Sequence, residues 1–355
     1  MKIRPKIKLI GYSTLIYGTA NLLTKLVVIT LVPLYTTYLS VNEVGLIVFL
    51  EMIELFVVTI IPIGCINAMW RFLAEEKGHN KNKIIISAFT VIMVSGLVII
   101  FLLLFFQNNI SSFFGIPNDN NLLVFVFVSC FLQSISHFIY SLLQYKNQSI
   151  FYLILSLVQF LSLVGLTIYL IVYSGQGIIG IYYAKTSVFF TSFICIIFIL
   201  IKNTRALPSF KFIKKILIFG LPLIPMMLLM PVLNVSDRYF LKLFTSLEEI
   251  GRYGIAYKFG MLINMFLVIP ISRSWGPQMF QVGKSEEENK KIHQDLTFYY
   301  SYVGWFIIVG LSFFSDTIIS IVANKEYLTV AWLIPWISLA YFVGGFKIFF
   351  LASAS

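Results

Sequence analysis

The sequence predicts an all-α polytopic membrane protein with about ten transmembrane helices, arranged as two six-helix bundles of which the second is incomplete. Three observations predict this fold: an excess of apolar residues, an alternation of basic and non-basic loops, and an internal repeat. Of the 355 residues, 59% are hydrophobic and 12% are charged, whereas a soluble domain carries about 25% charged residues. A chain of this size cannot bury so much apolar surface in one water-soluble core, so a soluble globular protein is excluded.

Apolar runs of about 20 residues predict the individual helices. We expect ten spans, at residues 10–39, 44–66, 84–106, 122–143, 150–173, 178–201, 212–244, 251–272, 296–314 and 331–353. The first span follows a basic start, but its apolar run is about twice as long as a signal-peptide core, and no small-residue cleavage site follows it. We therefore interpret it as a retained helix.

The basic residues predict how the helices are oriented. The N-terminus and the even-numbered loops carry 18 Lys and Arg, whereas the odd-numbered loops and helix ends carry 4. Because basic loops stay on the cytoplasmic side, this bias predicts a cytoplasmic N-terminus. The net charge of +11 is then mostly a topology signal, and no nucleic acid is expected as a partner. The three cysteines lie in apolar stretches without CxxC spacing, so neither a disulfide framework nor a metal site is expected.

An internal repeat predicts the two bundles. The sequence Ser40-Val-Asn-Glu-Val-Gly45 recurs as Ser246-Leu-Glu-Glu-Ile-Gly251, and a proline and a tryptophan follow each copy at similar distances. Six spans separate the copies, so both halves have the same orientation and are related by an axis along the membrane normal. We expect a first bundle at 1–206 and four helices of a second at 207–355. The last two helices of the second bundle are missing from this pattern, which predicts a fragment or a truncated gene product.

Ionisable residues within the spans are candidate functional groups, because a charge at bilayer depth is expensive. Lys25 lies near the middle of the first span. Glu51 and Glu54 share one face of the second span through their i, i+3 spacing, and Lys258 occupies nearly the equivalent place in the second half. Lys185 and Lys347 lie close enough to span ends that we expect their side chains to snorkel toward the interface.

Asp237 and Arg238 lie near the outer end of the seventh span, which three prolines would kink. Two interpretations of the charged residues remain open. In the functional one, Lys25, Arg238 and Lys258 attract an anion such as a diphosphate into a polar cavity between the halves, while the acids balance charge or carry a proton. In the structural one, the same residues form ion pairs that hold the helices together.

Two junctions of the chain resemble a known family. The stretches that carry the resemblance are Ile29 to Gly45, Ala68 to Phe72, Ser236 to Ser246 and Glu249 to Lys258. They look like Wzx-type polysaccharide and O-antigen flippases of the multidrug/oligosaccharidyl-lipid/polysaccharide (MOP) exporter superfamily, whose fold is MATE-like. Members of this family usually have twelve or more helices, so the ten expected here depart from the family pattern.

The resemblance implies a flippase in the bacterial cytoplasmic membrane that moves undecaprenyl-diphosphate-linked oligosaccharide units by alternating access. It implies substrate binding by Lys25, Arg238 and Lys258, and ion coupling or charge balance by Glu51, Glu54 and Asp237. The implied partners are the polyprenyl-diphosphate-linked oligosaccharide, membrane lipid, a coupling proton or sodium ion, and the polysaccharide polymerase and chain-length proteins. No cofactor is implied.

Two other functions remain open. A multidrug or small-molecule ion antiporter of the same superfamily would share the fold, although the basic residues at depth favour an anionic substrate. A membrane enzyme of polysaccharide assembly would need a large outer loop with catalytic residues, and the longest outer loops expected here have about 15 residues. No GxxxxGK[ST] sequence occurs, which argues against ATP hydrolysis by this chain. We therefore expect a transporter rather than an enzyme.

Overall fold

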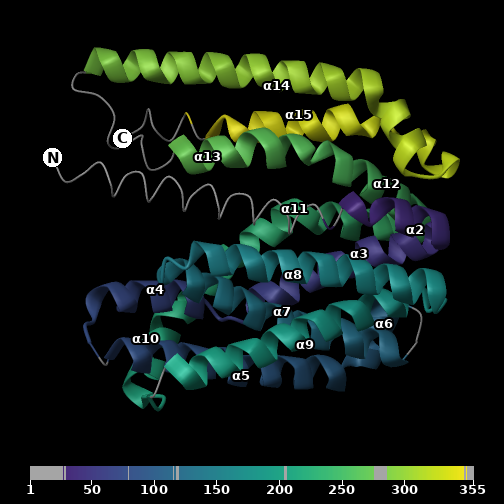
Figure 1. Ribbon diagram of the computed structural model, residues 1–355. Helices are drawn as coiled ribbons and strands as arrows, with labels where there is room; N and C mark the ends of the chain where they lie inside the picture. The colour runs from purple at the N-terminus through teal and green to yellow at the C-terminus, as the bar shows by residue number, and fades with distance from the viewer. Residues whose placement is uncertain are drawn as a thin grey trace. The chain divides into compact units, whose positions relative to one another are not determined.

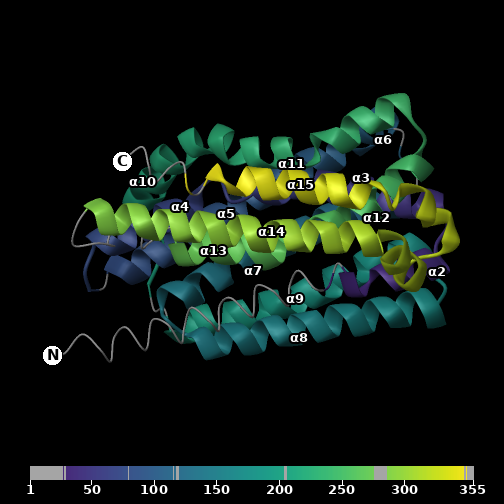
Figure 2. The same cartoon turned by 90° about the horizontal axis from the view of Figure 1, so that it is seen from above.

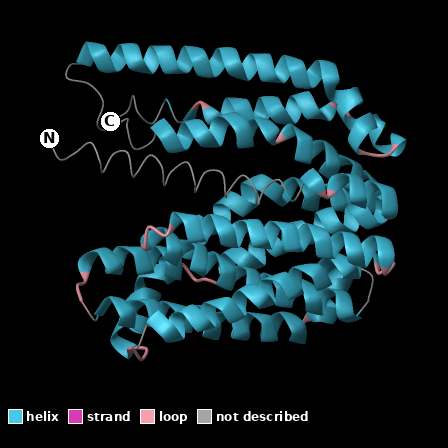
Figure 3. Cartoon of the chain, viewed as in Figure 1, coloured by secondary structure: helices cyan, strands magenta, loops and turns pink. Residues whose placement is uncertain are grey.

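The computed structural model describes residues 29–78, 80–114, 120–203, 206–275 and 286–347, together with Val27, Ile116 and Phe349. All regular structure in these residues is helical (Figure 3). Within them, eight segments are long and apolar enough to cross a membrane, and they match eight of the expected spans. The last expected span contains a shorter apolar helix, Leu333–Gly345, and most of the first lies outside the described residues. The all-α polytopic fold is confirmed.

The described residues form two compact units. The first contains Val27 and the described part of Leu46–Leu247, and the second contains the described parts of Val28–Gly45 and Glu248–Ser355 (Figure 1). Helix α3 (Val41–Ile60) therefore starts in the second unit and continues in the first. The chain passes from one unit to the other directly after the first copy of the repeated motif and again within the second copy. The division of the repeat at residue 206 is a separate matter and stays a prediction.

The first unit is a helical bundle around α7. Its helices after α3 are α4 (Cys65–Glu75), α5 (Asn80–Phe105), α6 (Gln107–Phe114), α7 (Asn120–Tyr145), α8 (Ser149–Ile168), η1 (Tyr169–Tyr173), α9 (Gly177–Asn203), α10 (Phe210–Gly220), η2 (Leu221–Leu223) and α11 (Ile224–Phe244). Helix α7 packs against α5 and α9, and α8 packs against α9. Gln159 of α8 joins three helices, since its amide accepts a hydrogen bond from Tyr140 and donates one to Ser192 at 2.6 Å. A polar side chain thus links the bundle in a region where apolar packing alone gives little specificity.

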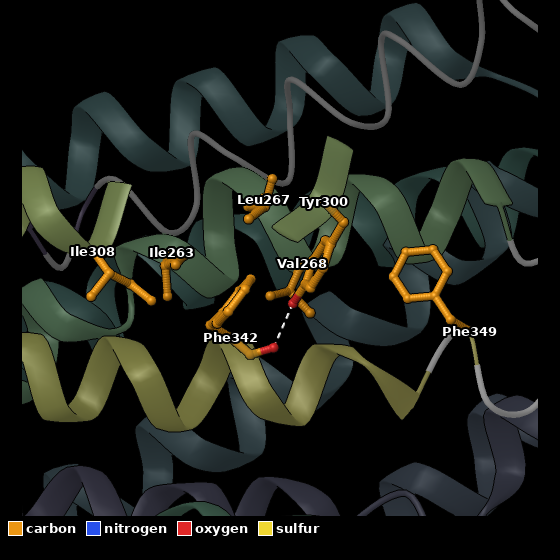
Figure 4. Packing of buried hydrophobic residues seen from close by; sticks show 7 residues of the cluster. All are labelled: Ile263, Leu267, Val268, Tyr300, Ile308, Phe342 and Phe349. Carbon is orange, nitrogen blue, oxygen red and sulfur yellow. Dashed lines mark hydrogen bonds between the residues drawn. The ribbon is translucent and has the colours of Figure 1, made fainter. Parts of the chain in front are cut away.

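The second unit contains the remaining helices. These are α2 (Val32–Tyr38), the start of α3, α12 (Leu247–Gly260), η3 (Asn264–Val268), α13 (Ile269–Trp275), α14 (Glu286–Val322), η4 (Lys325–Val330) and α15 (Leu333–Gly345). Helices α14 and α15 run side by side (Figures 1 and 2). Between them, the ring of Tyr300 stacks on Phe342, and its hydroxyl donates to the Phe342 carbonyl at 2.6 Å (Figure 4). The buried cluster around this pair fixes the packing of the unit.

The repeated motif begins a helix and lets it approach another backbone closely. Ser40 and Glu43 form a capping box, in which the Glu43 carboxylate accepts from the Ser40 N–H at 2.9 Å and the Ser40 hydroxyl accepts from the Glu43 N–H at 3.3 Å. Gly251 of α12 lies against the first turn of α3, where a Cβ would stand 2.6 Å from the Val41 carbonyl oxygen and 2.8 Å from the Gly45 nitrogen. The two equivalent glycines of the repeat therefore meet.

A break at Pro62 divides the second span into α3 and α4. Residues 61–64 form a turn in which Ile63 and Gly64 have positive φ angles of 47° and 65°. The Ser95 hydroxyl of α5 donates to the Ile61 carbonyl at 2.7 Å, which satisfies a backbone group that the broken helix leaves at membrane depth. Gly64 also lies against the backbone of Gly220, where a Cβ would be 2.6 Å from the Gly220 carbonyl oxygen. The break thus forms the contact that holds the end of α10.

Candidate functional site

A buried ion pair joins α3 and α9 within the first unit. The Lys185 ammonium donates to both carboxylate oxygens of Glu54, at 2.7 and 2.9 Å. The side chains are 18% and 10% exposed, respectively. The expectation that Lys185 snorkels to the interface is therefore wrong. By distance alone, the Lys185 side chain could extend toward the nearer end of its span. It faces the Glu54 carboxylate inside the bundle instead, and pairing with that charge outweighs extension toward water.

An aromatic side chain and a second acid complete this site. Tyr182 lies one turn before Lys185 on α9, is fully buried, and places its ring 4.7 Å from the Lys185 ammonium. Its hydroxyl is buried without a hydrogen-bond partner among the described residues and lies within electrostatic range of the Glu54 carboxylate. Glu51, one turn before Glu54 on α3, lies within electrostatic range of both Lys185 and Tyr182. Cys130 of α7 is buried nearby and is within electrostatic range of the pair.

The composition of this group determines its chemistry. We call Glu51, Glu54, Tyr182 and Lys185 the acidic cluster. With both carboxyl groups ionised and the lysine protonated, these four side chains together carry two negative charges and one positive charge. The Tyr182 ring adds a cation–π contact that stabilises the lysine in a dry setting.

The other predicted residues of the described chain lie elsewhere. Arg238 is buried on α11 of the first unit, and its backbone N–H donates to the Asp237 carboxylate at 2.8 Å. Lys258 is buried on α12 of the second unit, with its ammonium 5.8 Å from the ring of Tyr35. Next to it in sequence, the Tyr257 hydroxyl forms a 2.6 Å hydrogen bond with that of Tyr341. Lys25 lies outside the described residues.

The structure therefore brings together Glu51 and Glu54 as predicted, and adds Lys185 and Tyr182, which sequence reasoning had missed. A signal for Lys185 was present. The second and sixth expected spans enter the membrane from the same side, and Lys185 lies about as far into its span as Glu51 and Glu54 lie into theirs. Opposite charges at matched depth make the two residues candidates for a pair, although the sequence does not show that their helices face each other. Nothing in the pattern of α9 singles out Tyr182 from its neighbours.

The fold is similar to those of solved transporters. A multidrug resistance MATE family transporter of the MOP superfamily, in an inward-facing conformation, matches with a TM-score of 0.67 and 13% identity over 94% of this chain and 81% of that chain. The lipid II flippase MurJ, in an inward closed conformation, matches with a TM-score of 0.70 and 16% identity over 95% and 78%. The Vibrio cholerae MATE transporter VcmN matches with a TM-score of 0.62 and 11% identity over 98% and 83%. At these identities, the likeness shows the fold alone.

Sequence comparison identifies the family. No curated protein matches the chain significantly. A family model described as polysaccharide biosynthesis protein matches residues 10–283, which is well over half of the chain. This span includes both copies of the repeated motif and the whole acidic cluster. The chain therefore belongs to the polysaccharide biosynthesis protein family, and its helical fold is similar to those of a MATE family transporter and of MurJ.

Proposed function

We propose that the chain moves undecaprenyl-diphosphate-linked oligosaccharide units across the bacterial cytoplasmic membrane, by alternating access coupled to a proton or sodium gradient. The observation that carries this proposal is the family match over residues 10–283, in a chain whose described part has eight candidate spans. The N-terminus is on the cytoplasmic side in this account, as the distribution of Lys and Arg predicts. Sugar units made inside the cell would thus reach the polysaccharide polymerase and chain-length proteins outside.

In this proposal, the substrate's diphosphate binds to the cations Lys25, Arg238 and Lys258. The burial of Arg238 and Lys258 within apolar helices supports it, because charge-assisted hydrogen bonds to phosphate are stronger where the dielectric is low. The fixed charges would attract an anion and would reject an organic cation. An anionic lipid-linked substrate therefore suits these residues better than the substrate of a multidrug antiporter.

Ion coupling is the role we propose for the acidic cluster, with Asp237 balancing the charge of Arg238. A proton or sodium ion that binds at Glu51 or Glu54 changes the net charge around Lys185. Such a change weakens the Glu54–Lys185 pair and favours a different packing of α3 against α9. The gradient would thereby bias the equilibrium between two conformations.

We propose that these conformations are rearrangements of the two repeat halves, 1–206 and 207–355. The contact of Gly251 with the first turn of α3 supports the repeat, because equivalent positions meet there. In a parallel repeat, alternating access is largely a rigid-body rocking of one half against the other.

The test uses a bacterial strain that lacks its own flippase and carries this chain. Lys25→Ala is expected to abolish surface polysaccharide without lowering the amount of protein in the membrane, whereas Lys25→Arg retains the charge and is expected to retain polymer. Wild-type polymer in the Lys25→Ala strain would remove Lys25 from the site. If the unmodified chain changes drug resistance but not surface polysaccharide, the antiporter reading is correct and the flippase proposal is wrong.

A further inference from the structure

The first turns of α10 form an exposed surface on which lysines and large apolar side chains lie together. The helix carries Lys211, Lys214 and Lys215 and no acidic residue. Lys211 and Lys214 are exposed and are spaced i, i+3, so both point to one face. The same face continues through Ile218, which is 63% exposed, and begins beside Leu207 and Phe210, at 83% and 80%.

Such a mixture is typical of a helix in the interface of a membrane. Exposed rings and branched side chains of this size would be unfavourable in water, and lysines would be unfavourable in hydrocarbon. At the headgroup level, each kind of group has a suitable environment. Side chains deeper along the same segment, such as Leu221 and Met226, are also exposed and lie where lipid tails can cover them.

The length of the segment places the lysines at that level. Helices α10 and α11 belong to one candidate span, Phe210–Phe244, of 35 residues. At 1.5 Å per residue, such a segment is roughly 50 Å long, whereas the hydrocarbon core is about 30 Å thick. Even with the tilt of about 20–40° that such helices show, part of the segment therefore lies in the headgroup regions. The lysines are in its first turns, so they are among the groups that lie outside the hydrocarbon.

The surface is held rigidly by the rest of the first unit. The Ser209 N–H donates to the Ser87 hydroxyl of α5 at 2.9 Å, which fixes the start of α10. Phe212 and Ile216 are buried on the opposite face of the helix, and Gly220 packs against the turn at Gly64. This attachment of α10 to its neighbours favours binding, because little conformational freedom is lost when a ligand binds.

Two further cations lie beside this surface. The Lys215 ammonium is 5.8 Å from the ring of Phe72, and the Arg71 guanidinium is 4.6 Å from the ring of Phe219. Arg71 also pairs with Glu75 at 3.2 Å, so one acid is present. The region remains cationic, with four basic groups against one carboxylate. Charge complementarity therefore favours an anionic ligand that also carries an apolar part.

We propose that Lys211 and Lys214 bind the phosphate of an anionic phospholipid, with Phe210 and Ile218 against its acyl chains. The occupant is a bilayer lipid with a net negative headgroup, such as phosphatidylglycerol, and none of these four residues is among the proposed transport residues. Each lysine near an anionic headgroup contributes a factor of about five in affinity. The pair therefore discriminates an anionic from a zwitterionic lipid by more than tenfold.

The test is lipid binding to the purified full chain in detergent, followed by native mass spectrometry during titration with phosphatidylglycerol or phosphatidylcholine. The Lys211→Gln/Lys214→Gln variant is expected to lose phosphatidylglycerol affinity by tenfold or more, without a change for phosphatidylcholine. The control Lys242→Gln/Lys325→Gln removes the same charge from other positions and is expected to change either affinity less than twofold. Lys211→Arg/Lys214→Arg should retain binding, and added salt should weaken phosphatidylglycerol binding to the unmodified chain.

Three results would overturn the proposal. The first is equal affinity of the unmodified chain for the two phospholipids. The second is unchanged phosphatidylglycerol binding in the glutamine variant. The third is obtained from a parallel titration of the unmodified chain and the glutamine variant with polyprenyl diphosphate. If the variant loses that lipid but keeps phosphatidylglycerol, the surface belongs to the transported substrate. Because none of these readouts measures transport, failure here is distinct from failure of the flippase proposal.

Discussion

Removing one partner of the Glu54–Lys185 pair is expected to destabilise the chain far more than removing both. The Lys185 ammonium is 2.7 and 2.9 Å from the two carboxylate oxygens. At an effective dielectric constant of about 20, an attraction over such a distance is roughly 6 kcal/mol before desolvation is subtracted. Loss of one partner leaves the other charge buried, which costs about 3–5 kcal/mol in free energy of unfolding. Replacement of both by neutral side chains of similar size is expected to cost about 1–2 kcal/mol or less.

The assay is a double-mutant cycle on the purified chain, with Glu54→Gln, Lys185→Met and the double variant compared by denaturant unfolding in detergent. The expected coupling free energy is at least about 3 kcal/mol. Arg71 and Glu75 provide the matched control, because they form an exposed i, i+4 pair at 3.2 Å. Exposed pairs of this kind are worth about 0.3–0.5 kcal/mol. A Glu54–Lys185 coupling no larger than the control would refute the interpretation that a buried ion pair holds α3 to α9.

Four further substitutions, one of them a control, test the close packing and the polar links. Gly251→Ala is expected to lower the free energy of unfolding by about 1–3 kcal/mol, because its Cβ would meet backbone atoms of Val41 and Gly45. As a control, Gly310→Ala should be neutral or slightly stabilising, because nothing lies near the added Cβ. Equal effects of the two substitutions on the free energy of unfolding would contradict the close approach of Gly251 to α3. Ser95→Ala should cost about 1 kcal/mol because it removes a donor from the Ile61 carbonyl, and an unchanged thermal midpoint would show that this carbonyl has another donor. Gln159→Leu should cost a similar amount, about 1–2 kcal/mol, in the same measurement, and no loss of stability would mean that Tyr140 and Ser192 do not depend on it.

Much of the fold could be predicted from the sequence because the solvent imposes a simple rule. A segment in lipid must satisfy its backbone internally, so apolar runs of sufficient length become helices. The expected spans 84–106 and 122–143 correspond closely to α5 and α7 for this reason. The repeat was also visible, and Gly251 shows a physical reason for one of its glycines: it permits a close approach to the backbone of Val41 and Gly45 that a Cβ would obstruct.

The partners of the charged residues were harder to predict. Lys185 and Glu54 are 131 residues apart, and only packing decides which helix faces which. Distance from a span end describes how far a lysine would have to extend, but it does not say whether an acid lies beside it. The expected span 44–66 included no break after Ile60, and the donor from Ser95 depends on the neighbouring helix. Local rules thus predicted the elements, and tertiary contacts determined the acidic cluster.

Transport by the purified chain in proteoliposomes tests the central claim most directly. Vesicles are loaded on one leaflet with a polyprenyl-diphosphate-linked oligosaccharide, and an impermeant lectin measures its arrival on the other leaflet. The chain is expected to accelerate arrival, an imposed proton or sodium gradient is expected to increase the rate, and Lys258→Gln is expected to abolish it. Arrival no faster than in protein-free vesicles, with the chain folded and an ion gradient imposed, would contradict the account.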